Sequence, residues 1–273
     1  MLSNSGSSGS IVDELKSLRQ RVEDLERKEH LTGKYSAIGM ANSLFMNIPQ
    51  LLGYWTMGFL DEDSNILDLT PRQKHLLVDG SIGHYTWGVV SYLLMNSTDA
   101  LVRYDKDFLI GGNKTFGGWF YPAGNSGAGG MLLNMSEQSN YITYRAQWDS
   151  GNVFSFRMGN SAASAVCTVQ SAAMDANKWH FWVARHETSG GAADEVKLFV
   201  DGTWYSLGAT WGNSYTGWTD EYVRPLTIGA RYYSWGNIDN YQAGDFGPMF
   251  FSYAAVNEVI IENIYQITKG FFE

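Results

Sequence analysis

Apolar residues near the N-terminus recur with alternating spacings of four and three residues, at Ile11, Leu15, Leu18, Val22 and Leu25. This spacing is the heptad pattern of a coiled coil. Charged residues of opposite sign occupy the positions that pair between parallel helices in register. The pattern therefore predicts a parallel α-helical coiled coil over residues 11–33, preceded by a short tail at residues 1–10.

The segment from Arg21 to Glu26 resembles a trimer signature of short parallel coiled coils, which reads Arg, apolar, any two residues, apolar, Glu. Arg21, Val22, Leu25 and Glu26 supply its defining positions. An alternative is a single amphipathic helix that folds back onto the rest of the chain, because so short a coil is marginal on its own. In the trimer hypothesis, the residues of the interface are Ile11, Leu15, Leu18, Arg21, Val22, Leu25 and Glu26.

Downstream of a connector at residues 34–50, the pattern changes to short runs rich in β-branched and aromatic residues, separated by turn residues. The predicted strands cover residues 51–57, 91–95, 100–104, 114–121, 129–135, 141–148, 153–158, 179–185, 195–200, 203–207, 226–230 and 249–253. Only residues 257–269 have the pattern of a helix, with Asn257 as the N-cap. Many short strands without β–α alternation predict a mostly β, antiparallel sandwich over residues 51–273.

The composition supports this organisation and excludes several partners. Glycine is frequent, with 30 residues, and charged residues make up only 17% of the chain. The net charge of −9 and the absence of a basic patch argue against a nucleic-acid partner. Cys167 is the only cysteine, which excludes an internal disulfide and predicts a small buried strand residue. No membrane span and no secretory signal are expected.

Several segments, in order along the chain, resemble the laminin-G-like, concanavalin-A-like jelly roll of the lectin and glucanase superfamily. They extend from about Gly53 to Gly270 and are Leu52–Met57, Lys114–Phe120, Asn177–Arg185, Val196–Gly202, Leu226–Ala230 and Gly244–Met249. The resemblance implies a jelly-roll β-sandwich. The chain departs from the family pattern at residues 70–73, at Gly247–Phe250 and in an aromatic-rich insertion at residues 207–224, and these departures leave any family ligand site open.

Enzymatic activity is not expected. Glycosidases of the wider superfamily need two carboxylates that face each other across a cleft, and the Glu-x-Asp-x-(x)-Glu pattern is missing from this sequence. Glu187 and Glu195 flank a loop with no evident target, and Asp61–Asp63 lies in a turn. His180, within a tryptophan-rich strand, is expected to be a structural histidine whose hydrogen bonds are satisfied.

Calcium is a possible ligand, because many relatives bind it through loop carboxylates. Asp99, Asp105 and Asp107 are candidates by their positions, and Asp239 and Asp245 are further ones. The alternative is that these are solvated turn residues. No other cofactor is expected, and no Cys/His cluster suits zinc.

The aromatic insertion is the predicted glycan site, because rings beside amide, hydroxyl and carboxylate groups suit sugar faces and hydroxyls. An equally weighted alternative is that these rings are buried between subunits of the trimer. A second wall is expected just after residue 230. The candidate residues are Trp211, Asn213, Tyr215, Trp218, Asp220, Tyr222, Tyr233 and Trp235.

These features predict a homotrimeric virion protein, a bacteriophage fibre or surface protein, made in the host cytoplasm and exposed on the virion surface. Its tail would contact other virion proteins, and its β-sandwich would bind a host-surface glycan or another virion component. Three copies would give avidity. The alternatives are a purely structural head or tail decoration protein and a glycan-degrading enzyme.

Replacing Leu18 and Val22 with Asp tests the predicted coil, because charges in the apolar seam disfavour helix association. We expect the trimer to dissociate, as measured by the mass of the particle in solution. An unchanged mass would contradict the coiled coil.

Overall fold

The structure is a computed structural model that describes residues 39–40, 42–87, 90–104, 108, 112–124, 130–135, 144–158, 167–188, 195–206, 225–234 and 237–272. The predicted tail and coiled coil lie outside these residues. Within the described ranges, no helix is long and apolar enough to cross a membrane.

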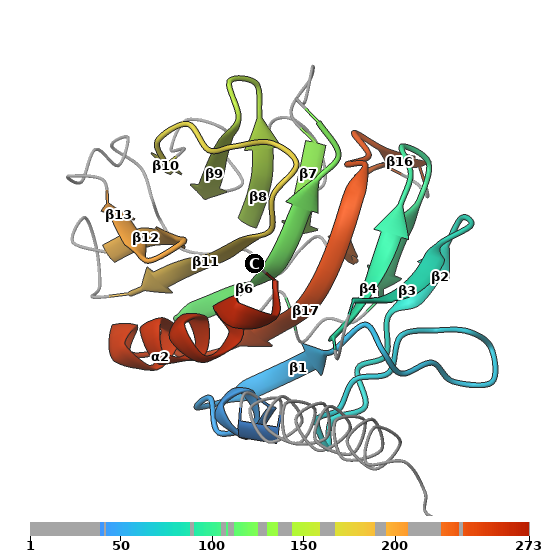
Figure 1. Cartoon of the computed structure of the whole chain (residues 1–273), viewed down its shortest axis with the longest axis horizontal. Coiled ribbons are helices and arrows are strands. Elements are labelled where there is room, and N and C mark those ends of the chain that lie inside the picture. The colour runs from blue at the N-terminus through green and yellow to red at the C-terminus, as the bar shows by residue number, and fades with distance from the viewer. Residues whose placement is uncertain are drawn as a thin grey trace, which may run out of the picture.

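Two antiparallel sheets form a sandwich, as the sequence predicts (Figure 1). One sheet, here called the helix-covered sheet, has β13 (Thr203–Ser206), β12 (Glu195–Val200), β11 (His180–Glu187), β6 (Lys114–Pro122), β17 (Gly244–Ser252), β4 (Val90–Met95) and β3 (Gly83–Trp87), with β1 (Leu51–Trp55) also paired to β17. The other, here called the polar sheet, has β10 (Cys167–Gln170), β9 (Val153–Met158), β8 (Tyr144–Asp149), β7 (Gly130–Met135), β14 (Leu226–Ile228), β5 (Ala100–Arg103) and β2 (Leu77–Asp79). A separate hairpin consists of β15 (Arg231–Ser234) and β16 (Asn237–Asp239).

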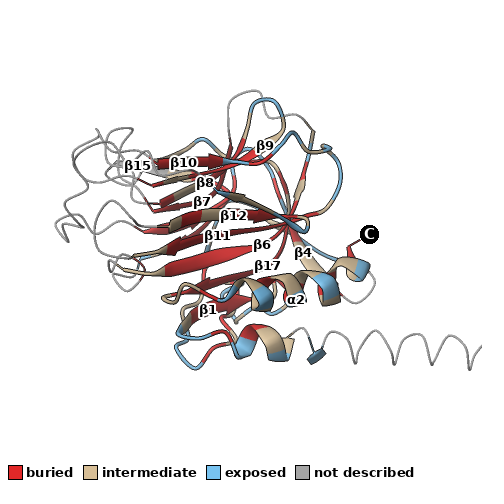
Figure 2. Ribbon diagram, turned by 90° about the vertical axis from the view of Figure 1, so that its left-hand side faces the viewer, coloured by how far each residue is buried: buried red, intermediate tan, exposed pale blue. Residues whose placement is uncertain are grey.

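The main hydrophobic core lies between the two sheets, where the ribbon is largely buried (Figure 2). Aromatic residues are prominent in this core. Phe116 on β6 stacks on Phe251 of the neighbouring strand, with ring centroids 5.5 Å apart. Its edge contacts reach Phe156 of the polar sheet at 5.5 Å. Aromatic pairs in these geometries add to the gain from burial alone. Cys167 is buried in this core, as predicted.

A second hydrophobic cluster covers the outer face of the helix-covered sheet. Helix α2 (Glu258–Thr268) contributes Ile261 and Ile264, and the predicted N-cap is confirmed, because the Asn257 side chain accepts a hydrogen bond from Val259 N at 2.9 Å. The end of the connector packs here too, since Phe45 is only 1% exposed. The central strands β11, β6 and β17 are therefore buried on both faces, and Figure 2 shows α2 on the side away from the polar sheet.

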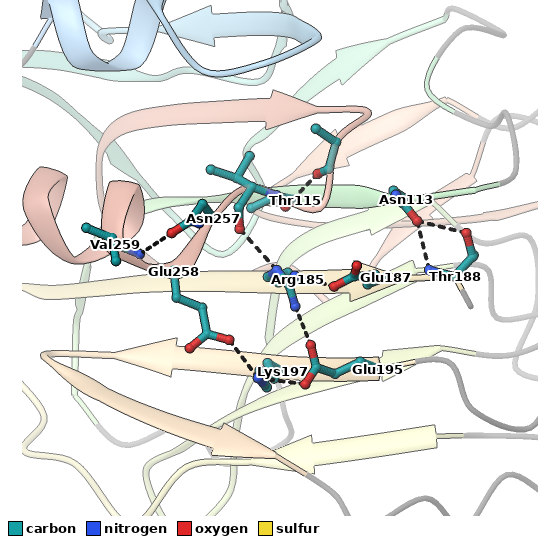
Figure 3. Close-up of polar contacts among 12 residues, drawn as sticks. Asn113, Thr115, Arg185, Glu187, Thr188, Glu195, Lys197, Asn257, Glu258 and Val259 are labelled. Atoms are coloured by element: carbon teal, nitrogen blue, oxygen red, sulfur yellow. Dashed lines mark hydrogen bonds and ion pairs between the residues drawn. The ribbon is translucent and has the colours of Figure 1, made fainter.

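An ionic network joins this helix to the sheet (Figure 3). The buried Arg185 guanidinium on β11 donates to Val256 O at 3.0 Å and binds the carboxylates of both Glu187 and Glu195. Lys197 bridges Glu195 to Glu258 in the first turn of α2. The expectation that Glu187 and Glu195 lack a target is therefore wrong, because a buried guanidinium requires such partners.

The last strand begins earlier than the sequence pattern predicts. β17 starts at Gly244 rather than at residue 249, although Pro248 removes a backbone donor within it. The register shifts between Phe246 and Met249, and this irregularity accommodates the proline inside the sheet. On the neighbouring strand, Gly118 approaches the bulge so closely that an added Cβ would lie 2.1 Å from Pro248 O.

Gly118→Ala should therefore destabilise the domain, because the added methyl meets backbone that cannot move freely. Overpacking of this kind costs about 1–3 kcal/mol, measured as the free energy of unfolding in urea. Gly270→Ala is the matched control, since nothing lies within 4 Å of its added Cβ. Equal stabilities of the two variants would contradict the close packing at the bulge.

Candidate ligand-binding site

The outer face of the polar sheet carries a row of hydrogen-bonding side chains instead of apolar ones. Strand alternation sends Tyr144, Ala146 and Trp148 into the core and Arg145 and Gln147 outward. The strand registers place Thr227, Asn134, Arg145, Arg157 and Thr168 side by side across five strands. Gln147 and Ser155 form the adjacent row. These seven residues are here called the polar floor.

The centre of the polar floor is well shielded from solvent. Asn134, Gln147, Ser155 and Thr227 are each at most 1% exposed. Thr227 donates to Ala230 O at 2.7 Å, and Ser155 donates to a carboxylate oxygen of Asp149 at 2.5 Å. Buried polar groups are costly unless they are bonded, so the fold fixes the positions of these side chains.

Three arginines gather at the floor. Arg157 pairs with Asp149 at 3.2 Å, and Arg231 binds both oxygens of Asp239 at 2.7 and 2.6 Å. Burial, together with the positive charges of Arg157 and Arg231, lowers the pKa of Arg145 to about 10. Within the described part of the chain, the Nε atoms of Arg145 and Arg157 have no hydrogen-bond partner. The floor thus presents donors suited to hydroxyl or carboxylate oxygens.

The β15–β16 hairpin forms a wall beside the floor. Ala230, Ile238 and Tyr241 pack on the outward-facing Ala100 and Val102 of β5. The second wall of a glycan site, predicted just after residue 230, stays a prediction, because the side chains of residues 232–237 lie outside the described part of the chain.

Most of the predicted glycan residues lie outside the described part of the chain. This holds for Trp211, Asn213, Tyr215, Trp218, Asp220, Tyr222 and Trp235. Tyr233 lies in β15, and only its backbone is described. The insertion that carries the first six precedes β14, which is the strand at one end of the polar floor. Its role in binding stays a prediction.

Sequence reasoning missed the floor itself. The signal was present, because Arg145, Gln147, Ser155 and Arg157 alternate with apolar residues along two predicted strands. Alternation of period two identifies an outward face. It does not show which strands are neighbours, and the row of side chains depends on that pairing.

The calcium candidates are not brought together in the described residues. The Asp99 carboxylate accepts hydrogen bonds from Ser81 N at 3.0 Å and Asn96 N at 2.8 Å, which fixes a turn. Asp239 is held by Arg231. Among described residues, no group of three or more potential ligands is found, and Asp105 and Asp107 lie outside them. Calcium binding therefore stays a prediction.

His180 has the structural role expected from the sequence. One ring nitrogen bonds Asp201 at 2.6 Å and the other bonds Asp175 O at 2.7 Å. With both nitrogens occupied in a buried side chain, the imidazole is not placed to exchange a proton with a substrate.

These features agree with the comparison of the chain with known families. Residues 96–249, more than half of the chain, match the concanavalin A-like lectin/glucanases superfamily. The chain belongs to this superfamily. A search of curated proteins gives no significant match.

Solved structures with the same fold include binding domains of larger proteins. The receptor-binding domain of botulinum neurotoxin mosaic serotype C/D has a TM-score of 0.59 at 12% identity, over 80% of this chain and 50% of that one. Domain 4 of AbnA, an arabinanase from Geobacillus stearothermophilus, solved with arabinotriose, has a TM-score of 0.55 at 11% identity, over 81% and 100%. The binding domain of botulinum neurotoxin DC in complex with SialylT has a TM-score of 0.55 at 9% identity, over 80% and 51%. The chain thus spans about half of the neurotoxin domains.

Arg145→Met should raise the free energy of unfolding, because it removes a desolvated charge beside two like charges. We expect a gain of about 1 kcal/mol, since partial exposure screens the repulsion. Arg157→Met is the matched control, and it should give no gain because it also breaks the ion pair with Asp149. Urea unfolding measures both variants. A greater loss of stability for Arg145→Met than for Arg157→Met would contradict this assignment.

Proposed function

We propose that the chain is the glycan-binding head of a homotrimeric virion protein, a fibre or surface protein of a bacteriophage. The polar floor is the observation that carries the binding role. A head that needed only to pack against neighbouring proteins would gain nothing from three arginines crowded on one partly buried sheet face. Retaining a destabilising charge is typical of a site that a ligand completes.

The chemistry of the floor suits an oligosaccharide. The hydroxyl group of Thr168, which is partly exposed, can exchange hydrogen bonds with sugar hydroxyls. Arg145 and Arg157 present guanidinium groups that bind a carboxylate through two parallel hydrogen bonds. An acidic or hydroxyl-rich glycan therefore fits better than an apolar ligand. In this proposal, the aromatic insertion at residues 207–224 supplies the stacking surface that the floor lacks.

The structural neighbours support a binding role. Two of them were solved with carbohydrate-type ligands, arabinotriose for domain 4 of AbnA and SialylT for the neurotoxin DC binding domain. The same fold thus presents such ligands in proteins of unrelated function. These neighbours support a binding role through their shared fold alone, and the residues of the polar floor support the location of the site in this chain.

The trimer and the virion rest on the N-terminal sequence. A parallel coil at residues 11–33 would carry three heads, so weak individual sites would bind a repetitive surface tightly. The tail at residues 1–10 would attach the assembly to other virion proteins.

A glycan array of the intact protein tests this proposal, with three variants in parallel. Arg145→Met should reduce binding about tenfold or more, as expected when a charge-assisted bond is lost. Trp218→Ala should weaken binding to the same glycans. Phe59→Ala, an exposed aromatic residue outside the floor, is the control and should bind normally.

The other outcomes each contradict part of the proposal. Undiminished binding by Arg145→Met would exclude the polar floor as the site. Absence of binding by a folded wild-type trimer to every glycan would contradict the glycan role and favour a structural decoration protein.

A further inference from the structure

A second concave site lies on the opposite side of the sandwich, at the C-terminal end of α2. It is a cavity of about 770 Å³ on the outer face of the helix-covered sheet. Five aromatic residues contribute to its lining: Trp119, Tyr121, Trp179, Tyr265 and Phe272. The polar floor and this cavity lie on different sheets, so the inference below does not depend on the proposed function.

An open row of aromatic rings extends from the cavity toward the edge of the sheet. Trp179 contacts Tyr121 with ring centroids 5.7 Å apart, and it contacts Tyr92 of β4 at the same distance, 5.7 Å. Tyr92 stacks on Tyr85 of the edge strand β3, also at 5.7 Å. Tyr85 is 48% exposed, and the other three rings are partly exposed. The surface thus offers ring faces to a ligand rather than only to the core.

A carboxylate lies within this row. Asp245 of β17 is in register with Tyr121 on one side and with Leu94 on the other. It is partly buried, and its charge acts on Tyr92, where it helps to raise the pKa of the phenol after burial, the larger cause. No hydrogen bond or ion pair of the Asp245 carboxylate is found among the described residues.

Asp245 differs in this respect from the two acids that line the cavity. Asp175 is bound by Lys178 at 2.5 Å, and Asp201 is bound by His180 at 2.6 Å. Those two carboxylates therefore each have a side-chain partner within the chain. Asp245 supplies the uncompensated negative charge of this surface.

We propose that the aromatic row and Asp245 together bind an organic ammonium group, carried by an amino sugar or by a lysine side chain. A cation over ring faces is attracted by the π-electrons, and more strongly when it is desolvated. The carboxylate supplies the counter-charge and accepts the hydrogen bonds of the ammonium group. The net charge of −9 further favours a cation over an anion. The cavity beside Trp179 then receives the uncharged remainder of the ligand.

Binding should depend on pH in a defined direction. Burial raises the pKa of Asp245 to about 6. The titratable groups that face it are the phenols of Tyr92 and Tyr121, and the pKa of Tyr92 is raised above its usual value, mainly by burial. The site is thus ionised above about pH 7, and its charge is lost as the pH falls through 6.

The raised pKa of Asp245 also makes the stability of the domain depend on pH. The folded carboxyl holds its proton more tightly than the unfolded chain does, so the free energy of unfolding falls as the pH rises from about 4 to 6. Asp245→Asn removes this penalty and should unfold at a higher urea concentration than the wild type at neutral pH. This check also shows that the variant folds.

Calorimetry on the full chain at about pH 7 tests the proposal. The sugar arm compares a glucosamine tetramer with its N-acetylated counterpart, and the peptide arm compares a lysine peptide with its acetyl-lysine form. We expect binding in at least one arm, limited to the charged form. Asp245→Asn should weaken it about tenfold, and Tyr85→Ala should weaken it less. Asp63→Asn, which removes the same charge from an exposed turn, should leave it unchanged.

A trimethylated form of the binding ligand gives the pH profile, because its charge does not titrate. Its affinity should fall as the pH decreases through 6. Equal binding of charged and acetylated ligands, or unchanged affinity in Asp245→Asn, would overturn the proposal, as would absence of binding in both arms. Arg145→Met leaves this surface intact, so its effect on glycan binding reports only on the polar floor.

Discussion

The exclusion of water from both faces of one sheet is the constraint on which the rest of this structure depends. The helix-covered sheet packs on the polar sheet on one side and on α2 and Phe45 on the other. Its central strands are therefore buried at almost every position, as in β11, where seven of eight residues are buried. Among the residues that the structure describes, no helix covers the outer face of the polar sheet, and that face carries hydrogen-bonding groups. This difference in how the two outer faces are covered determines where ligands can bind.

Specific polar contacts, as well as apolar burial, hold α2 against the helix-covered sheet. Arg185 crosses from β11 to the chain just before α2, and Lys197 reaches Glu258 at the start of the helix. Breaking a buried pair of this kind is costly because it leaves an uncompensated charge. The same reasoning separates Arg185 from Arg145. The first binds two carboxylates directly, whereas the second lies beside Arg157 and Arg231, whose own aspartate partners only partly offset their effect on it.

The sequence predicts the fold well where local signals dominate. The N-cap at Asn257 is a local signal of this kind. The tight turn at Asp201 and Gly202 is another, and these two turn residues both have positive φ. It fails at the start of β17, because the rule that proline ends a strand is overridden when a bulge absorbs it. It also fails for the candidate sites. The surface around Asp245 is built from strands distant in sequence, and the polar floor joins β14 to the consecutive strands β7 to β10. Neither can be recognised before the order of the strands is known.

The central claim is that an oligosaccharide binds across the polar floor, and a crystal structure of the chain with the glycan that binds most tightly tests it most directly. The account predicts sugar oxygens within hydrogen-bonding distance of the partly exposed Arg145, Arg157 and Thr168. A glycan bound elsewhere, with these side chains untouched, would contradict it.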